Sequence, residues 1–173
     1  MFFAKNITLR RRLGMSIRGG NREAKLSTGF FFLLILCSVL LGLFENPFGT
    51  VDLIARSTAL AIALALLAVN LLIGATSLVG LGDSWRVGVL EDQQTDLVEG
   101  GIYRFSRNPY FLSYLIMFAA YTVLLQSVIL LVLSSVGFAM IHAMVLREEK
   151  HLKALHGEMY RQYQKRVPRY ILF

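Results

Sequence analysis

Four apolar blocks, separated by short turns and by one long polar interval, organise this chain. They cover about residues 29–44, 57–81, 110–125 and 128–146. The second block contains no charged residue and is long enough to cross the ~30 Å hydrocarbon core of a bilayer. We therefore predict an all-α integral membrane protein with four transmembrane helices.

The third and fourth blocks are separated only by Gln126 and Ser127. Such a short connection leaves no room for a loop, so these two helices are expected to form a tight antiparallel hairpin. With four crossings in all, both ends of the chain fall on the same side of the membrane.

The tail after the fourth block, residues 147–173, predicts one further helix. Between residues 147 and 166 apolar side chains recur three or four positions apart, at Leu152, Leu155, Met159 and Tyr163. Lysine and arginine occupy positions on the other side, which is the pattern of an amphipathic helix. We expect this helix to lie in the membrane interface.

Composition and charge agree with a membrane location. Hydrophobic residues make up 55% of the chain and charged residues 17%, against about 45–50% and about 25% in soluble domains. Residues 1–25 carry a net charge of +6 and residues 147–173 carry +4, whereas the region between them carries −3. Basic ends beside apolar blocks follow the positive-inside rule, which places both termini in the cytoplasm, at a bacterial inner membrane or a eukaryotic endoplasmic reticulum. Membrane lipids, and not nucleic acid, are the expected partners.

These boundaries divide the chain into a basic cytoplasmic segment, residues 1–28, and a membrane domain, residues 29–173.

The polar interval 82–109 is longer than a connector needs, which indicates a site on the cytoplasmic side. At its end, Asn108 can cap a helix whose first position is Pro109. That helix start, with basic side chains beside it, can bind an anion; the alternative is simple anchoring at the interface. The basic side chains are those of Arg104 and Arg107.

Glu148 and Glu149 follow the fourth block directly. A helix C-terminus disfavours carboxylates, so two of them there indicate a cationic partner, either protein or ligand; a solvated helix end is the alternative.

His142 lies on nearly the same face as Glu149, and an ionisable group inside the bilayer suggests a function. A neutral histidine hydrogen-bonded to another helix is the alternative. The sequence has no metal-ligand cluster, no Ser-His-Asp pattern and no phosphate-binding glycine loop.

Over about residues 80–170 the chain carries, in order, LGDSWRVGV, TDLVEGGIYRFSRNPYFLSY, an apolar hairpin and REEKHLKALHGEMYRQYQKRVPR. This order of motifs resembles the isoprenylcysteine carboxyl methyltransferase family of integral membrane enzymes. The resemblance implies S-adenosylmethionine as methyl donor and a lipophilic acceptor, which is an isoprenylcysteine carboxylate, a thiol or a lipid. The cofactor-binding positions that it implies are Thr95, Asp96, Leu97, Val98, Tyr103, Asn108, Pro109, Tyr110, Phe111, Glu148 and Glu149.

The chain departs from the family pattern where Asn108 replaces a histidine and Phe111 replaces a tyrosine. Asparagine cannot take up a proton, but methyl transfer from a sulfonium depends mainly on alignment and desolvation. We therefore expect an active methyltransferase. Two alternatives stay open: an NADPH-dependent membrane enzyme of the sterol-reductase type, and a catalytically silent homologue that keeps the fold to bind a partner.

Overall fold

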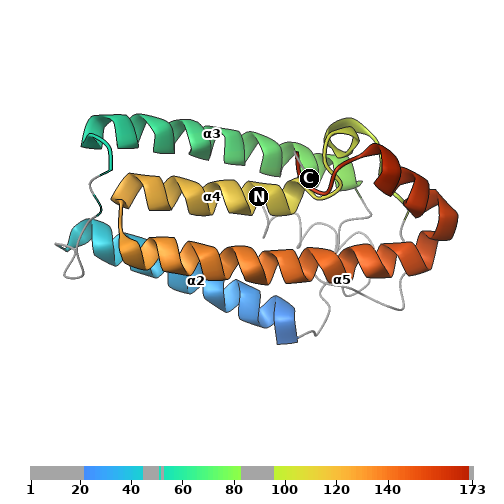
Figure 1. Ribbon diagram of the computed structural model, residues 1–173, viewed down its shortest axis with the longest axis horizontal. Helices are drawn as coiled ribbons and strands as arrows, with labels where there is room; N and C mark the ends of the chain where they lie inside the picture. Colours follow the sequence, from blue (N-terminus) through green and yellow to red (C-terminus); the bar gives the residue numbers. More distant parts are fainter. Residues whose placement is uncertain (1–21, 45–50, 52, 83–95, 172–173) are drawn as a thin grey trace.

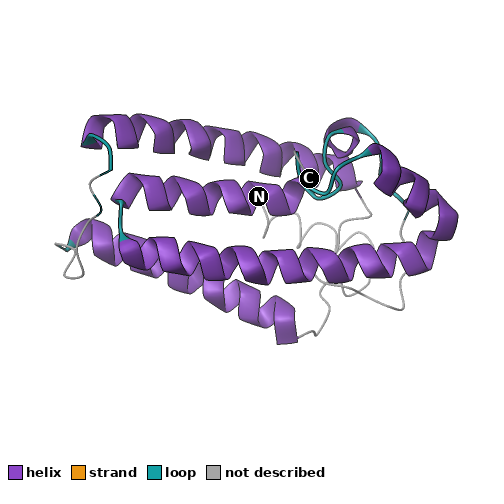
Figure 2. Ribbon diagram, in the orientation of Figure 1, coloured by secondary structure: helices purple, strands orange, loops and turns teal. Residues whose placement is uncertain are grey.

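The computed structural model describes residues 22–44, 51, 53–82 and 96–171. Within them the regular elements are helices joined by loops, as Figure 2 shows. They are α2 (Arg22–Leu43), α3 (Arg56–Leu81), the short 3-10 helix η2 (Gly101–Arg104), α4 (Pro109–Leu125) and α5 (Val128–Arg166).

The four α-helices coincide with the four apolar blocks, which confirms the all-helical prediction for the described part of the chain. α2 begins earlier than its apolar block, and α5 continues well beyond its own. Among the described helices, α3 and α5 are long and apolar enough to cross a membrane. α4 has 17 residues and measures about 26 Å, slightly less than a typical hydrocarbon core. Four crossings therefore stay a prediction.

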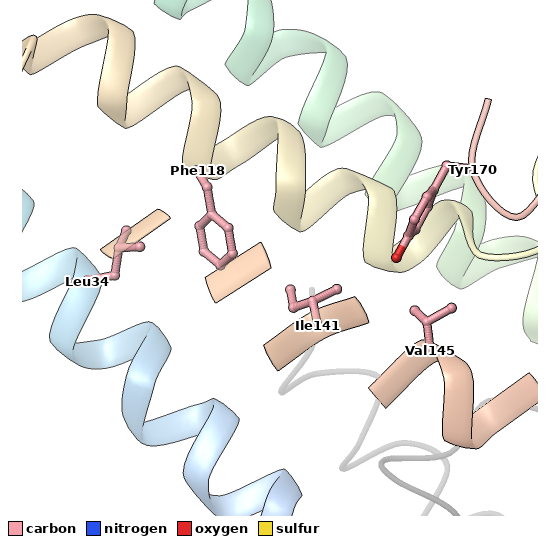
Figure 3. Packing of buried hydrophobic residues seen from close by; sticks show 5 residues of the cluster. All are labelled: Leu34, Phe118, Ile141, Val145 and Tyr170. Atoms are coloured by element: carbon pink, nitrogen blue, oxygen red, sulfur yellow. The ribbon is translucent and has the colours of Figure 1, made fainter. Parts of the chain in front are cut away.

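α4 packs between α3 and α5, and α2 lies against α5 (Figure 1). The core between these helices is built from Leu34 of α2, Phe118 of α4, and Ile141 and Val145 of α5, as Figure 3 shows. Tyr170, beyond the end of α5, completes it. The outward-facing apolar side chains of the helices are largely exposed, which suits a lipid environment better than water.

Gly137 allows α5 to approach α2 and α4 closely. A Cβ atom at this position would lie 2.7 Å from the ring of Phe118 and 2.8 Å from the ring of Phe30. Any larger residue would therefore push the aromatic side chains out of the core.

The predicted hairpin is present between α4 and α5. Gln126 ends α4 in the left-handed conformation with φ 43°, and Ser127 directly precedes α5. The Gln126 side-chain oxygen accepts hydrogen bonds from the backbone N–H groups of Leu53 and Ile54, at 2.9 and 3.1 Å. Its Nε2 donates to the carbonyl of Ile54 at 3.0 Å. This side chain thus fastens the segment before α3 to the hairpin turn.

α5 changes direction at Gly157, which has φ 55° and ψ −120°, a conformation that favours glycine. Of the apolar positions predicted on either side of this point, Met159 is 61% exposed and Tyr163 is buried. Tyr160 and Val167 are buried together with Tyr163. Residues 158–166 are helical, while their location in a membrane interface stays a prediction.

Candidate cofactor and acceptor site

The chain beyond α5, residues 167–171, crosses the start of α4 and is called here the C-terminal segment (Figure 1). It is fastened to the loop before α4 by backbone contacts. The N–H of Arg107 donates to the carbonyl of Pro168 at 3.0 Å, and the Ser106 hydroxyl donates to the carbonyl of Arg169 at 3.1 Å. Residues more than 60 positions apart therefore form one end of the helical bundle.

Glu149 is the centre of a buried ion-pair cluster, with a side chain only 5% exposed. Arg107 bonds to Oε1 through Nε at 3.1 Å and Nη2 at 3.0 Å, and Arg169 bonds to Oε2 through Nη2 at 2.9 Å. Asn108 Nδ2 also donates to Oε1 at 2.9 Å. Burial raises the pKa of Glu149, but the hydrogen bond from Arg169 and the charge of Arg107 outweigh it and hold this pKa below its usual value. Protein groups thus satisfy this carboxylate completely.

Arg107 links the same cluster to the end of α5. Its Nη1 donates to the carbonyls of Gln164 at 3.0 Å and Val167 at 2.9 Å. Since its guanidinium is committed to these groups and to Glu149, Arg107 does not form the predicted anion site. Arg104 is exposed, with its guanidinium over the ring of Phe105 at 5.7 Å.

Glu148, next in the chain to the clustered carboxylate, has a different environment. Its own carboxylate makes no hydrogen bond or ion pair with any residue in the described part of the chain. Burial, and secondarily the charge of Glu149, raise the pKa of Glu148 to about 7. A half-buried carboxylate without a counter-ion among the described residues is costly, and this property marks candidate functional sites.

Tyr103 lies within electrostatic range of Glu148. Burial, followed by the charge of Glu148, raises the pKa of the Tyr103 phenol. Its ring packs on α3, where a Cβ atom at Gly80 would lie 3.3 Å away, and its carbonyl accepts a 2.7 Å hydrogen bond from the Tyr163 hydroxyl. The fold therefore brings together two predicted site residues that are distant in sequence.

The other predicted site residues differ in how deeply they are buried. Pro109 is buried at the start of α4, Phe111 packs against the core, and Leu97 packs against Tyr160, Tyr163 and Val167. Val98 is half-buried and Asp96 is exposed, while Thr95 lies outside the described residues.

The predicted side-chain cap at Asn108 is wrong. Asn108 occupies the N-cap position, but its side chain makes no capping hydrogen bond. It bonds to Glu149 instead, because a charged acceptor attracts the amide more strongly than a backbone group does. Asn108 and Glu149 are therefore bonded to each other, and their binding of a cofactor stays a prediction.

Sequence reasoning gave no role to Arg169. The Tyr114 hydroxyl lies 2.6 Å from that of Tyr110, one helical turn away, a spacing that the sequence does show. His142 has a protein partner, since its Nδ1 lies 3.3 Å from the Tyr170 hydroxyl. That partner belongs to the C-terminal segment, not to another helix.

A model of the phospholipid methyltransferase family matches residues 58–159, more than half of the chain. The matched region contains nearly all of α3, together with η2, α4, the hairpin and both glutamates. Its helices and this match define the class as a membrane methyltransferase. The chain belongs to the phospholipid methyltransferase family, which includes the membrane methyltransferases that its motifs resemble. No curated protein matches the chain.

Proposed function

We propose that the protein transfers a methyl group from S-adenosylmethionine to a lipophilic acceptor at the cytoplasmic face of the membrane. One observation carries the proposal: of two adjacent glutamates, Glu149 is neutralised by Arg107 and Arg169, whereas Glu148 has no cation among the described residues. A carboxylate in this situation suits the α-ammonium group of the cofactor.

The neighbouring side chains fit the rest of such a cofactor. Tyr103 presents an aromatic ring close to Glu148, and aromatic faces attract cationic groups such as a sulfonium. Leu97 and Phe111 supply apolar surface near the same end of the bundle. When bound, the cofactor supplies the methyl group on a positively charged sulfur. The protein aligns the reactants and excludes water, which does not require Asn108 to carry a proton.

The family and the apolar helix surfaces favour a membrane lipid as acceptor. We propose a phospholipid amine first, and an isoprenylcysteine carboxylate or a thiol as the other acceptors. A shallow, open depression of about 300 Å³ between α4 and α5 has mainly apolar walls and can take part of an acyl chain. Its lining residues are Leu115, Phe118, Ala119, Ser134, Ser135 and Phe138.

Calorimetric titration of the detergent-purified full chain with S-adenosylmethionine tests the cofactor assignment. Saturable binding is expected for the wild type and its loss in Glu148→Gln, which keeps the side-chain shape but removes the charge. Glu158→Gln is the matched control, because Glu158 is 61% exposed and its ion pair among the described residues is with Arg161 on the same helix. Unchanged binding in Glu148→Gln would contradict the assignment. Binding of NADPH in place of S-adenosylmethionine would support the reductase alternative.

A further inference from the structure

Tyr110 and Tyr114 form a hydroxyl pair on α4 that nothing described so far uses. Their hydroxyl oxygens lie 2.6 Å apart and their rings pack edge to face at 5.0 Å. Other tyrosine hydroxyls near this end of the bundle are used by the protein. That of Tyr163 donates to a carbonyl, and that of Tyr170 is bonded to His142.

One of the two hydroxyl hydrogen atoms of this pair has no acceptor within the described part of the chain. Two hydroxyls carry two hydrogen atoms, and one hydrogen bond between them uses only one. Neither of the two hydroxyl groups makes another hydrogen bond with a described residue. Because a half-buried donor without an acceptor is unfavourable, the second hydrogen atom is available to a ligand.

The surroundings of the pair are apolar on one side and close to the proposed cofactor site on the other. The ring of Phe31 on α2 lies 4.4 Å from that of Tyr114, and Phe111 lies 6.3 Å from Tyr110. Tyr110 is also within electrostatic range of Tyr103. Tyr114 lies about 6 Å further along α4 than Tyr110, away from the helix start and into its apolar part. This depth suits a molecule that enters from the bilayer better than one that enters from water.

We propose that the Tyr110–Tyr114 pair binds the acceptor lipid, donating its free hydroxyl hydrogen to an anionic oxygen of the lipid phosphodiester. The inference rests on the proposed function and deepens it by identifying residues that select a phosphate-containing acceptor. It moves Tyr110 from the cofactor to the acceptor.

The test measures methyl transfer from labelled S-adenosylmethionine to phosphatidylethanolamine in mixed micelles, with the lipid mole fraction varied. Tyr110→Phe and Tyr114→Phe keep the rings but remove one hydroxyl each. Each variant is expected to raise KM for the lipid about tenfold, the usual effect of losing a hydrogen bond to a charged group. The affinity for S-adenosylmethionine should stay unchanged. Tyr121→Phe, further along α4, is the control, since the Tyr121 hydroxyl bonds to no described residue and its loss should change nothing.

A second substrate separates phosphate recognition from general damage. With a long-chain primary amine that lacks phosphate, the Phe variants should match the wild type. An unchanged lipid KM in Tyr110→Phe and Tyr114→Phe would overturn the proposal, as would a weaker affinity for S-adenosylmethionine with the lipid KM preserved. A wild-type protein that binds no S-adenosylmethionine would instead overturn the proposed function, and this inference with it.

Discussion

Replacing Glu149 with glutamine should destabilise the fold, because this carboxylate joins α5, the loop before α4 and the C-terminal segment. Removing one partner of a buried ion pair typically costs about 3–5 kcal/mol. Arg169 is 29% exposed and can be rehydrated, whereas Arg107 is 9% exposed and keeps two backbone carbonyl acceptors. We therefore expect the lower end, about 3 kcal/mol.

Thermal unfolding of the purified chain in detergent, followed by far-UV circular dichroism, measures this effect. About 3 kcal/mol corresponds to a Tm lower by roughly 6–12 °C for a chain of this size. Glu158→Gln removes only an exposed pair and should change stability by less than about 1 kcal/mol. Equal Tm values for Glu149→Gln and Glu158→Gln would refute the reasoning that the Glu149 cluster holds this end of the bundle together.

Two other predictions concern Glu148 and the break in α5. Burial raises the pKa of Glu148 to about 7, so its carboxylate is neutral below that pH and cannot pair with an ammonium group. The affinity for S-adenosylmethionine, measured by calorimetry, should rise between about pH 6 and about pH 8 and then level off, and the control Glu158→Gln should show the same rise. Gly157→Ala should destabilise the protein by about 1–3 kcal/mol through backbone strain alone, since no atom lies within 4 Å of the added Cβ. An unchanged Tm for Gly157→Ala would contradict the positive φ at this position.

The helices could be predicted from the sequence because their signals are local. The uncharged block 57–81 became α3, and the two residues between the last two blocks became the hairpin turn. The break at Gly157 could not be predicted from the pattern, because a periodicity count assumes one continuous helix. A glycine in the sequence does not by itself predict a break, since many helices contain glycine without bending.

For the candidate site, the sequence predicted the pair of carboxylates but not the side chains that contact them. Two carboxylates at a helix end indicated a cationic partner, but which of them the protein itself neutralises depends on tertiary packing. Arg107 precedes Glu149 by 42 positions and Arg169 follows it by 20, so no local pattern connects the three. The same packing directs Asn108 away from the helix cap and toward Glu149. The structure thus separates two glutamates that the sequence could only treat as a pair.

The most direct test of the account is methyl transfer itself. The full chain, reconstituted in vesicles containing phosphatidylethanolamine, is incubated with S-adenosylmethionine labelled on its methyl group, and the lipids are then extracted and counted. The account predicts label in the lipid with the wild type and with Glu158→Gln, and its absence with Glu148→Gln. A folded wild-type protein that binds S-adenosylmethionine but labels no lipid would contradict a lipid methyltransferase.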